Sequence, residues 1–150
     1  MDARDTQPIL IVEDSDDDFE ATERALKRDG RLFNPIVRFD NGAEALDYLF
    51  HRGAYAGPEA APLPGLMLLD LNMPGVDGRA VLTAVKSHRD TRAIPVVVLT
   101  TSDDDWDINE CYNAGANTYI KKPVDLDGFF AALCNLKNYW LDLALLPRTS

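Results

Sequence analysis

Residues 65–78 read GLMLLDLNMPGVDG, and this stretch decides the fold of the chain. Four apolar residues, 66–69, lead directly into Asp70, and a Met-Pro pair and two glycines follow. A short apolar run bounded by turn residues is typical of a strand buried on both faces of a parallel sheet. Because ligands bind outside the carboxyl ends of such strands, Asp70 is placed for chemistry. An acidic turn residue is the alternative, and this stretch alone leaves both readings open.

Four further strand patterns occur along the chain, and a helical pattern follows each strand. We expect strands at residues 9–12, 35–39, 66–69, 95–99 and 118–120, and helices at residues 16–27, 43–51, 79–88, 103–113 and 126–145. This alternation predicts an α/β domain, a doubly wound five-stranded parallel sheet with helices on both faces. Residues 1–8 are expected to be a disordered lead-in, 9–146 the domain and 147–150 a tail, with no output domain.

Two of the predicted helices have clear starts. Asn41 and Glu44 have the spacing of a capping start for the helix at 43–51. Asp16, Asp17 and Asp18 lie in the first turn of the preceding helix, where the helix dipole favours negative charge. The dipole alone explains these aspartates, so no functional role is assigned to Asp17 or Asp18.

Polar side chains stand at the carboxyl ends of four predicted strands: Glu13, Asp14, Asp70, Thr100 and Lys122. Converging carboxylates repel one another unless a cation relieves them, and hard oxygen ligands suit Mg²⁺. A metal ion and an ammonium group can neutralise phosphoryl oxygens, to which a hydroxyl donates a hydrogen bond. Asp70 is central and can act as the nucleophile that forms an aspartyl phosphate. The alternative is that each polar residue merely caps its own strand. That explanation is reasonable for a single strand end but less so for all four together.

Four blocks of the sequence resemble the receiver domain of two-component response regulators. They are ILIVED (9–14), LMLLDLNMPGVDG (66–78), PVVVLTTS (95–102) and AGANTYIKKP (114–123). The resemblance covers nearly the whole chain and implies a flavodoxin-like (CheY-like) fold. It also implies that Asp70 accepts a phosphoryl group from a histidine kinase.

The resemblance further implies a metal site. Asp14, Asp70 and the backbone carbonyl of Asn72 would bind Mg²⁺, and Glu13 would contact the ion through water. The acid pair is often Asp-Asp in the family, and the Glu13–Asp14 pair here is a mild departure that leaves the metal site intact.

The remaining site residues are also implied by the resemblance. Thr100 and Lys122 would hold the phosphoryl oxygens, and Tyr119 would turn inward when Thr100 moves toward them. The Lys122–Pro123 peptide would be cis, which sets the direction of the lysine. Thr101 replaces a smaller residue common at this position, and we expect it to narrow access to the phosphoacceptor.

A narrower resemblance concerns the partner. VEDSDDDFE, the GAEALDYLF helix with its long following loop, and the YW pair near the end resemble single-domain regulators paired with phytochrome-type histidine kinases. This implies that a phytochrome-type kinase donates the phosphoryl group and that a downstream phosphotransfer or effector protein is the target of the signal.

Composition limits the other classes of function. The chain has 150 residues and a formal net charge of -10, which argues against binding to nucleic acid or to anionic membranes. It has no secretory signal or apolar segment of transmembrane length, so a cytoplasmic protein is expected. Its 2 cysteines, Cys111 and Cys134, are interpreted as small buried hydrophobes.

Three other functions share some of these sequence features. Asp14, Asp16 and Asp18 have the alternate spacing of a calcium loop, but Phe19 and Ala25 stand where that loop needs Gly and Glu. A phosphohydrolase of the haloacid dehalogenase type needs a second Asp two residues after the nucleophile, and that residue here is an Asn. A degenerate receiver acting as a scaffold is disfavoured because the set of site residues is complete. We therefore expect no enzyme activity beyond self-catalysed phosphoryl transfer and autodephosphorylation.

The helix predicted at 126–145 has more apolar surface than docking on one sheet requires. A helix that is apolar most of the way round is buried on more than one side. We expect a homodimer whose contacts include Leu136, Tyr139, Trp140, Leu143 and Leu146. A final helix fully covered within one chain is the alternative.

Overall fold

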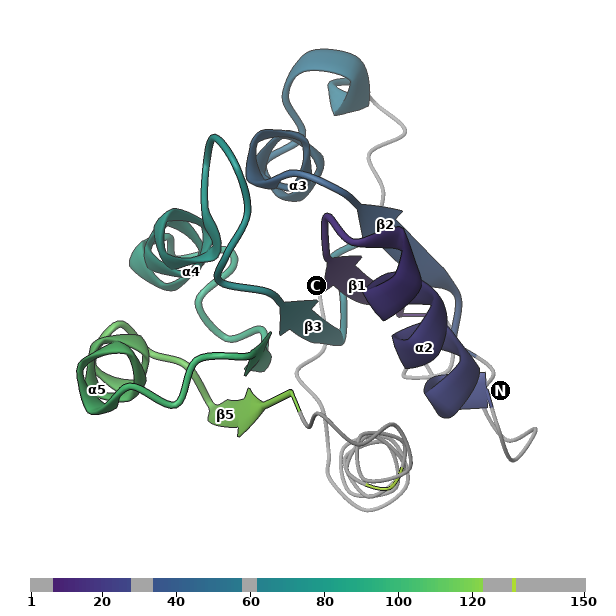
Figure 1. The fold of residues 1–150 in the computed structure, drawn as a ribbon. Helices are drawn as coiled ribbons and strands as arrows, with labels where there is room; N and C mark the ends of the chain where they lie inside the picture. The colour runs from purple at the N-terminus through teal and green to yellow at the C-terminus, as the bar shows by residue number, and fades with distance from the viewer. Residues whose placement is uncertain (1–6, 28–33, 58–61, 123–130, 132–150) are drawn as a thin grey trace.

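The structure is a computed structural model that describes residues 7–27, 34–57, 62–122 and 131 (Figure 1). Its strands are β1 (Ile9–Val12), β2 (Ile36–Phe39), β3 (Leu66–Leu69), β4 (Val96–Thr100) and β5 (Thr118–Lys121). They form one sheet in the order β2-β1-β3-β4-β5, and every neighbouring pair is parallel. This is the strand order of flavodoxin-like folds, so the predicted fold class is confirmed.

The described helices follow the strands as predicted, with ends that differ by one or two residues. They are α2 (Asp16–Lys27), α3 (Gly42–Leu49), the 3₁₀ turn η1 (Gly53–Tyr55), α4 (Gly78–Ser87) and α5 (Asp105–Asn113). The predicted helix at 126–145 falls outside the described residues except for Ala131, which is helical. No described helix is long and apolar enough to cross a membrane.

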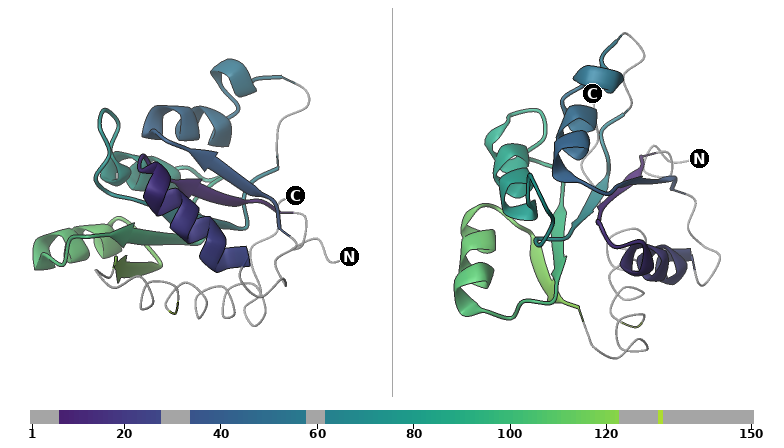
Figure 2. Two further views of the ribbon diagram at one scale, coloured as in Figure 1. Left: turned by 45° about the vertical axis from the view of Figure 1, so that its right-hand side comes forward. Right: turned by 45° about the horizontal axis from the view of Figure 1, so that its top comes forward.

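The sheet separates two apolar cores. Helix α2 covers one face, whereas α3, α4 and α5 cover the other, as Figure 2 shows from two directions. Because side chains alternate along a strand, β1 contributes Ile9 and Ile11 to the α2 side and Leu10 and Val12 to the other side. All four of these side chains are buried, as expected for a strand with helices on both faces.

Local capping sets where the helices begin. The Asn41 side chain accepts a hydrogen bond from the backbone N–H of Glu44 at 2.8 Å, which confirms the predicted start of α3. Asp77 and Asp104 cap α4 and α5 in the same way. Each cap therefore fixes the point at which the chain leaves the carboxyl edge of the sheet and enters a helix.

Candidate phosphoacceptor and metal site

Three carboxylates meet at the carboxyl edge of the sheet. Glu13 and Asp14 follow β1 and Asp70 follows β3, and these two strands pair directly, with Val12 opposite Leu69. The strand order reverses between β1 and β3, which is where open α/β sheets bind ligands. One oxygen from each of the three carboxylates lies within 4.8 Å of the other two.

This donor set fits a hard divalent cation such as Mg²⁺. The carboxylates of Glu13 and Asp70 are buried, and Asp14 is exposed, so the site is open to water on one side. Ionised carboxylates at this separation repel one another strongly unless a cation lies among them. All the donors are oxygen atoms, and Mg²⁺ usually binds one or two carboxylates together with several waters.

Tight packing of the β3–α4 loop holds Asp70 in place. The backbone N–H of Gly78 donates to the carbonyl oxygen of Leu71 at 3.0 Å, which brings the start of α4 back onto the end of β3. A Cβ atom at Gly78 would lie 2.1 Å from the backbone oxygen of Asp70, so only glycine fits there. The backbone N–H of Asn72 lies 3.3 Å from Asp70 Oδ1 and donates to it.

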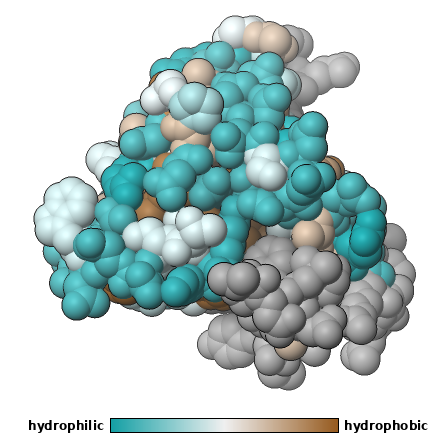
Figure 3. All heavy atoms as spheres, viewed as in Figure 1, coloured by the Kyte–Doolittle hydropathy of each residue, from teal (hydrophilic) through white to brown (hydrophobic). Residues whose placement is uncertain are grey.

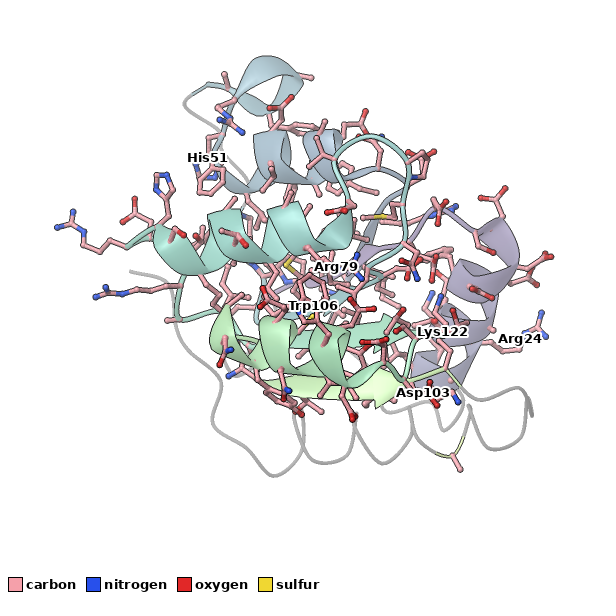
Figure 4. All side chains as sticks on the ribbon, turned by 60° about the vertical axis from the view of Figure 1, so that its left-hand side comes forward. Arg24, His51, Arg79, Asp103, Trp106 and Lys122 are labelled. Carbon is pink, nitrogen blue, oxygen red and sulfur yellow. The ribbon has the colours of Figure 1, made fainter. Side chains whose placement is uncertain are left out.

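Lys122 brings a positive charge into the acidic site. Its Nζ lies 2.5 Å from Glu13 Oε1, 2.8 Å from Asp18 Oδ2 and 3.8 Å from Asp70 Oδ2. Figure 4 shows this lysine beside α2. Burial lowers the pKa of Lys122, but the hydrogen bonds to Asp18 and Glu13 outweigh burial and raise the pKa above its usual value.

Glu13 is the strongly perturbed acid of the site. Burial raises its pKa to about 8, because desolvation outweighs the hydrogen bond from Lys122 and the neighbouring Asp70 adds to the rise. A buried carboxyl with this pKa holds a proton at neutral pH unless a cation replaces it. A cation bound at this site would favour the charged form of Glu13 and would therefore release the proton.

Thr100 closes the other side of the site. Its buried hydroxyl oxygen accepts hydrogen bonds from Asn72 Nδ2 and from the backbone N–H of Ser102, each at 3.3 Å. The half-buried Tyr119 donates from its hydroxyl to the carbonyl oxygen of Ser102 at 2.8 Å. The ring of Tyr119 is thus tied to the loop that begins at Thr100.

The structure brings together Glu13, Asp14, Asp70, Asn72, Thr100 and Lys122, as the sequence predicted. The Lys122–Pro123 peptide lies outside the described residues, and so do Cys134 and the predicted dimer residues Leu136, Tyr139, Trp140, Leu143 and Leu146. Cys111 is described and is buried, as expected for a small hydrophobe.

Sequence reasoning missed two residues that contact the site. Asp18 was explained by the helix dipole alone, yet its carboxylate binds Lys122. Arg38 on β2 donates from Nε and Nη2 to the carbonyl oxygen of Glu13, at 3.2 and 3.0 Å, and pairs with Asp16 at 2.8 Å. A charged residue inside an otherwise apolar strand pattern was the available signal for Arg38, and the sequence holds no comparable signal for Asp18.

Comparison with known proteins identifies the family. Residues 9–134 match the response regulator receiver domain, and the chain belongs to that family. Response regulator Rcp1 of Synechocystis is 37% identical over 139 residues, which are 93% of this chain and 92% of Rcp1. The resemblance to receiver domains is thereby confirmed.

Solved structures give the same result. The phosphorylated cyanobacterial phytochrome response regulator RcpA is 37% identical, with a TM-score of 0.87 over 95% of this chain and 99% of RcpA. The Mn²⁺-bound form of Rcp1 is 36% identical, with a TM-score of 0.87 over 94% of this chain and 99% of Rcp1. The narrower resemblance to phytochrome-associated regulators is confirmed as well. Receiver domains of this family take a phosphoryl group from a histidine kinase onto an aspartate.

Proposed function

We propose that this chain is a phosphorylation switch whose acceptor is Asp70. The observation that carries the proposal is the convergence of three carboxylates, a lysine and a buried threonine hydroxyl around the end of β3. An Asp70 oxygen attacks the phosphorus of a kinase phosphohistidine, so that an O–P bond forms while the N–P bond to the imidazole breaks. The imidazole leaves with the electron pair of that bond and takes up a proton from water.

The other site residues stabilise the transferred group. Lys122 and the Thr100 hydroxyl interact with the phosphoryl oxygens, where negative charge collects during transfer. Asp14, Asp70, the Asn72 carbonyl and, through water, Glu13 would hold Mg²⁺. When bound, the ion supplies positive charge at the phosphoryl oxygens. A cis Lys122–Pro123 peptide would set the direction of the lysine side chain.

The signal passes from the phosphoryl group to the surface. Thr100 moves toward the phosphoryl oxygens, and Tyr119 follows because its hydroxyl is bonded to the loop that begins at Thr100. The chain then acts through a changed protein-interaction surface, in the cytoplasm and without binding nucleic acid. A phytochrome-type kinase is the proposed donor, since RcpA is a phytochrome response regulator. A phosphotransfer or effector protein is the proposed target.

Intact mass spectrometry tests the acceptor. After incubation with acetyl phosphate and Mg²⁺ the chain should gain the mass of one phosphoryl group, and EDTA or the Asp70→Asn substitution should abolish the gain. A gain that persists in Asp70→Asn would place the acceptor elsewhere. No gain in the wild-type chain would favour a scaffold function, and turnover of acetyl phosphate without accumulation would favour a phosphohydrolase.

A further inference from the structure

Asp18 and Asp70 both lie close to the ammonium group of Lys122. The lysine ammonium lies 2.8 Å from Asp18 Oδ2 but 3.8 Å from Asp70 Oδ2, and its shortest contact, at 2.5 Å, is with Glu13. An ammonium group has three N–H donors, and two of them are already directed to Glu13 and Asp18. In this arrangement the lysine lies toward α2, one ångström farther from Asp70 than from Asp18.

Asp18 is itself held firmly by its backbone. Its N–H donates to Ser15 Oγ at 3.2 Å, and its carbonyl oxygen accepts from the buried Thr22 hydroxyl at 2.8 Å. The carboxylate therefore projects from a fixed turn of α2. Because Asp18 is held in this way, its contact with Lys122 is broken when the lysine moves.

The two acids that hold the lysine differ in exposure. The Glu13 side chain is 6% exposed and the Asp18 side chain is 46% exposed. Water screens the half-exposed pair and can replace the lysine on Asp18, so this is the weaker of the two contacts. Of the two partners, Asp18 is the one that Lys122 can leave at small cost.

We propose that Asp18 is a positioning residue that holds Lys122 away from Asp70 until a phosphoryl group arrives. The ammonium then exchanges the Asp18 carboxylate for phosphoryl oxygens, and water takes the place of the lysine on Asp18. Asp18 thus lowers the affinity of the site for the phosphoryl group by the free energy of one half-exposed ion pair. This inference rests on the proposed role of Asp70 as the acceptor.

Beryllofluoride, a non-covalent mimic of the phosphoryl group, provides a test that needs no turnover. Its affinity for the full chain at saturating Mg²⁺ is measured by titration calorimetry. The Asp18→Asn substitution removes the charge of this ion pair and so weakens the hold on Lys122, which should tighten binding about two- to five-fold, the range expected for a half-exposed ion pair. Asn keeps the shape of the side chain and suits the first turn of a helix, so the fold is preserved.

Asp17→Asn is the matched control. Asp17 is exposed in the same turn of α2, and its substitution removes the same charge without freeing Lys122. A gain in Asp18→Asn that exceeds the gain in Asp17→Asn, and that disappears when Lys122 is also replaced by Met, supports the proposal. Equal effects of the two substitutions, or weaker binding in Asp18→Asn, would overturn it. Undiminished binding in Asp70→Asn would instead overturn the proposed acceptor.

Discussion

Glu13 links the chemistry of the site to pH. It is buried beside Asp70 and Lys122, and burial raises its pKa from 4.5 to about 8. Because the folded protein holds this proton more tightly than the unfolded chain, Glu13 makes the metal-free fold less stable as pH rises from 4.5 toward 8. A divalent cation reverses this effect, since it stabilises the charged carboxylate.

The affinity for Mg²⁺ should therefore rise with pH. Below the raised pKa the cation must displace the Glu13 proton, so the apparent affinity should increase by up to about tenfold per pH unit between about pH 6 and pH 8, and level off above that. Titration calorimetry at several pH values measures this apparent affinity for Mg²⁺. In Glu13→Gln the Mg²⁺ affinity should depend much less on pH. An equally weak pH dependence in the wild-type chain would contradict the raised pKa of Glu13.

Helix α5 is attached to the molecule mainly by polar contacts at its first turn. It has one fully buried residue, Cys111, so apolar burial holds it only weakly. Asp107 on its first turn accepts from Arg79 Nη2 on α4 at 2.6 Å and from Ser102 Oγ at 2.8 Å. Figure 4 shows Arg79 between the two helices. The same Ser102 also accepts from Tyr119, so the first turn of α5 is connected to the proposed switch.

Replacement of Asp107 should loosen this attachment. Asp107→Asn should lower the free energy of unfolding by about 1 kcal/mol, because the Arg79 guanidinium loses its charged, partly buried acceptor. Urea denaturation measures the loss. Asp105→Asn is the control, since Asp105 is exposed in the same turn of α5. Losses of the same size in both variants would mean that general helix-dipole effects, not the contact with Arg79, stabilise the turn.

The whole molecule exposes few large apolar side chains over its described part. The face in Figure 3 is largely polar over its described part. The large apolar side chains exposed among the described residues are Trp106 and Tyr112, both on α5. Two separate residues do not form the contiguous apolar patch that a stable dimer buries. We therefore propose that the homodimer uses the helix predicted at 126–145.

Sedimentation velocity at micromolar concentration tests the dimer. The wild-type chain should sediment with twice the mass of one chain, and Leu143→Asp should shift it to the monomer, because a charge cannot be buried in an apolar contact at small cost. Trp106→Ala removes an exposed aromatic side chain elsewhere and should leave the dimer unchanged. A wild-type monomer would rule out the proposed dimer.

Local sequence patterns were enough to predict the described strands and helices, their order and the acids of the site. Apolar runs and helical periodicity are local properties, so β1, β3 and their following helices could be located without a structure. Parallel strands place their carboxyl ends on one edge, so Asp14 and Asp70 could be brought together by topology alone. The ends of the described helices were predicted to within one or two residues because caps such as Asn41 are also local.

The pairing of charged side chains across the fold could not be predicted from the sequence and became visible in the folded structure. Lys122 and Asp18 are separated by 104 residues, and Arg79 and Asp107 by 28, and no local pattern joins either pair. Which acid a lysine contacts depends on how α2 packs against the sheet, and that packing is set by apolar contacts far from the charges. The raised pKa of Glu13 has the same origin, because burial of its carboxyl exists only once the strands and helices have assembled.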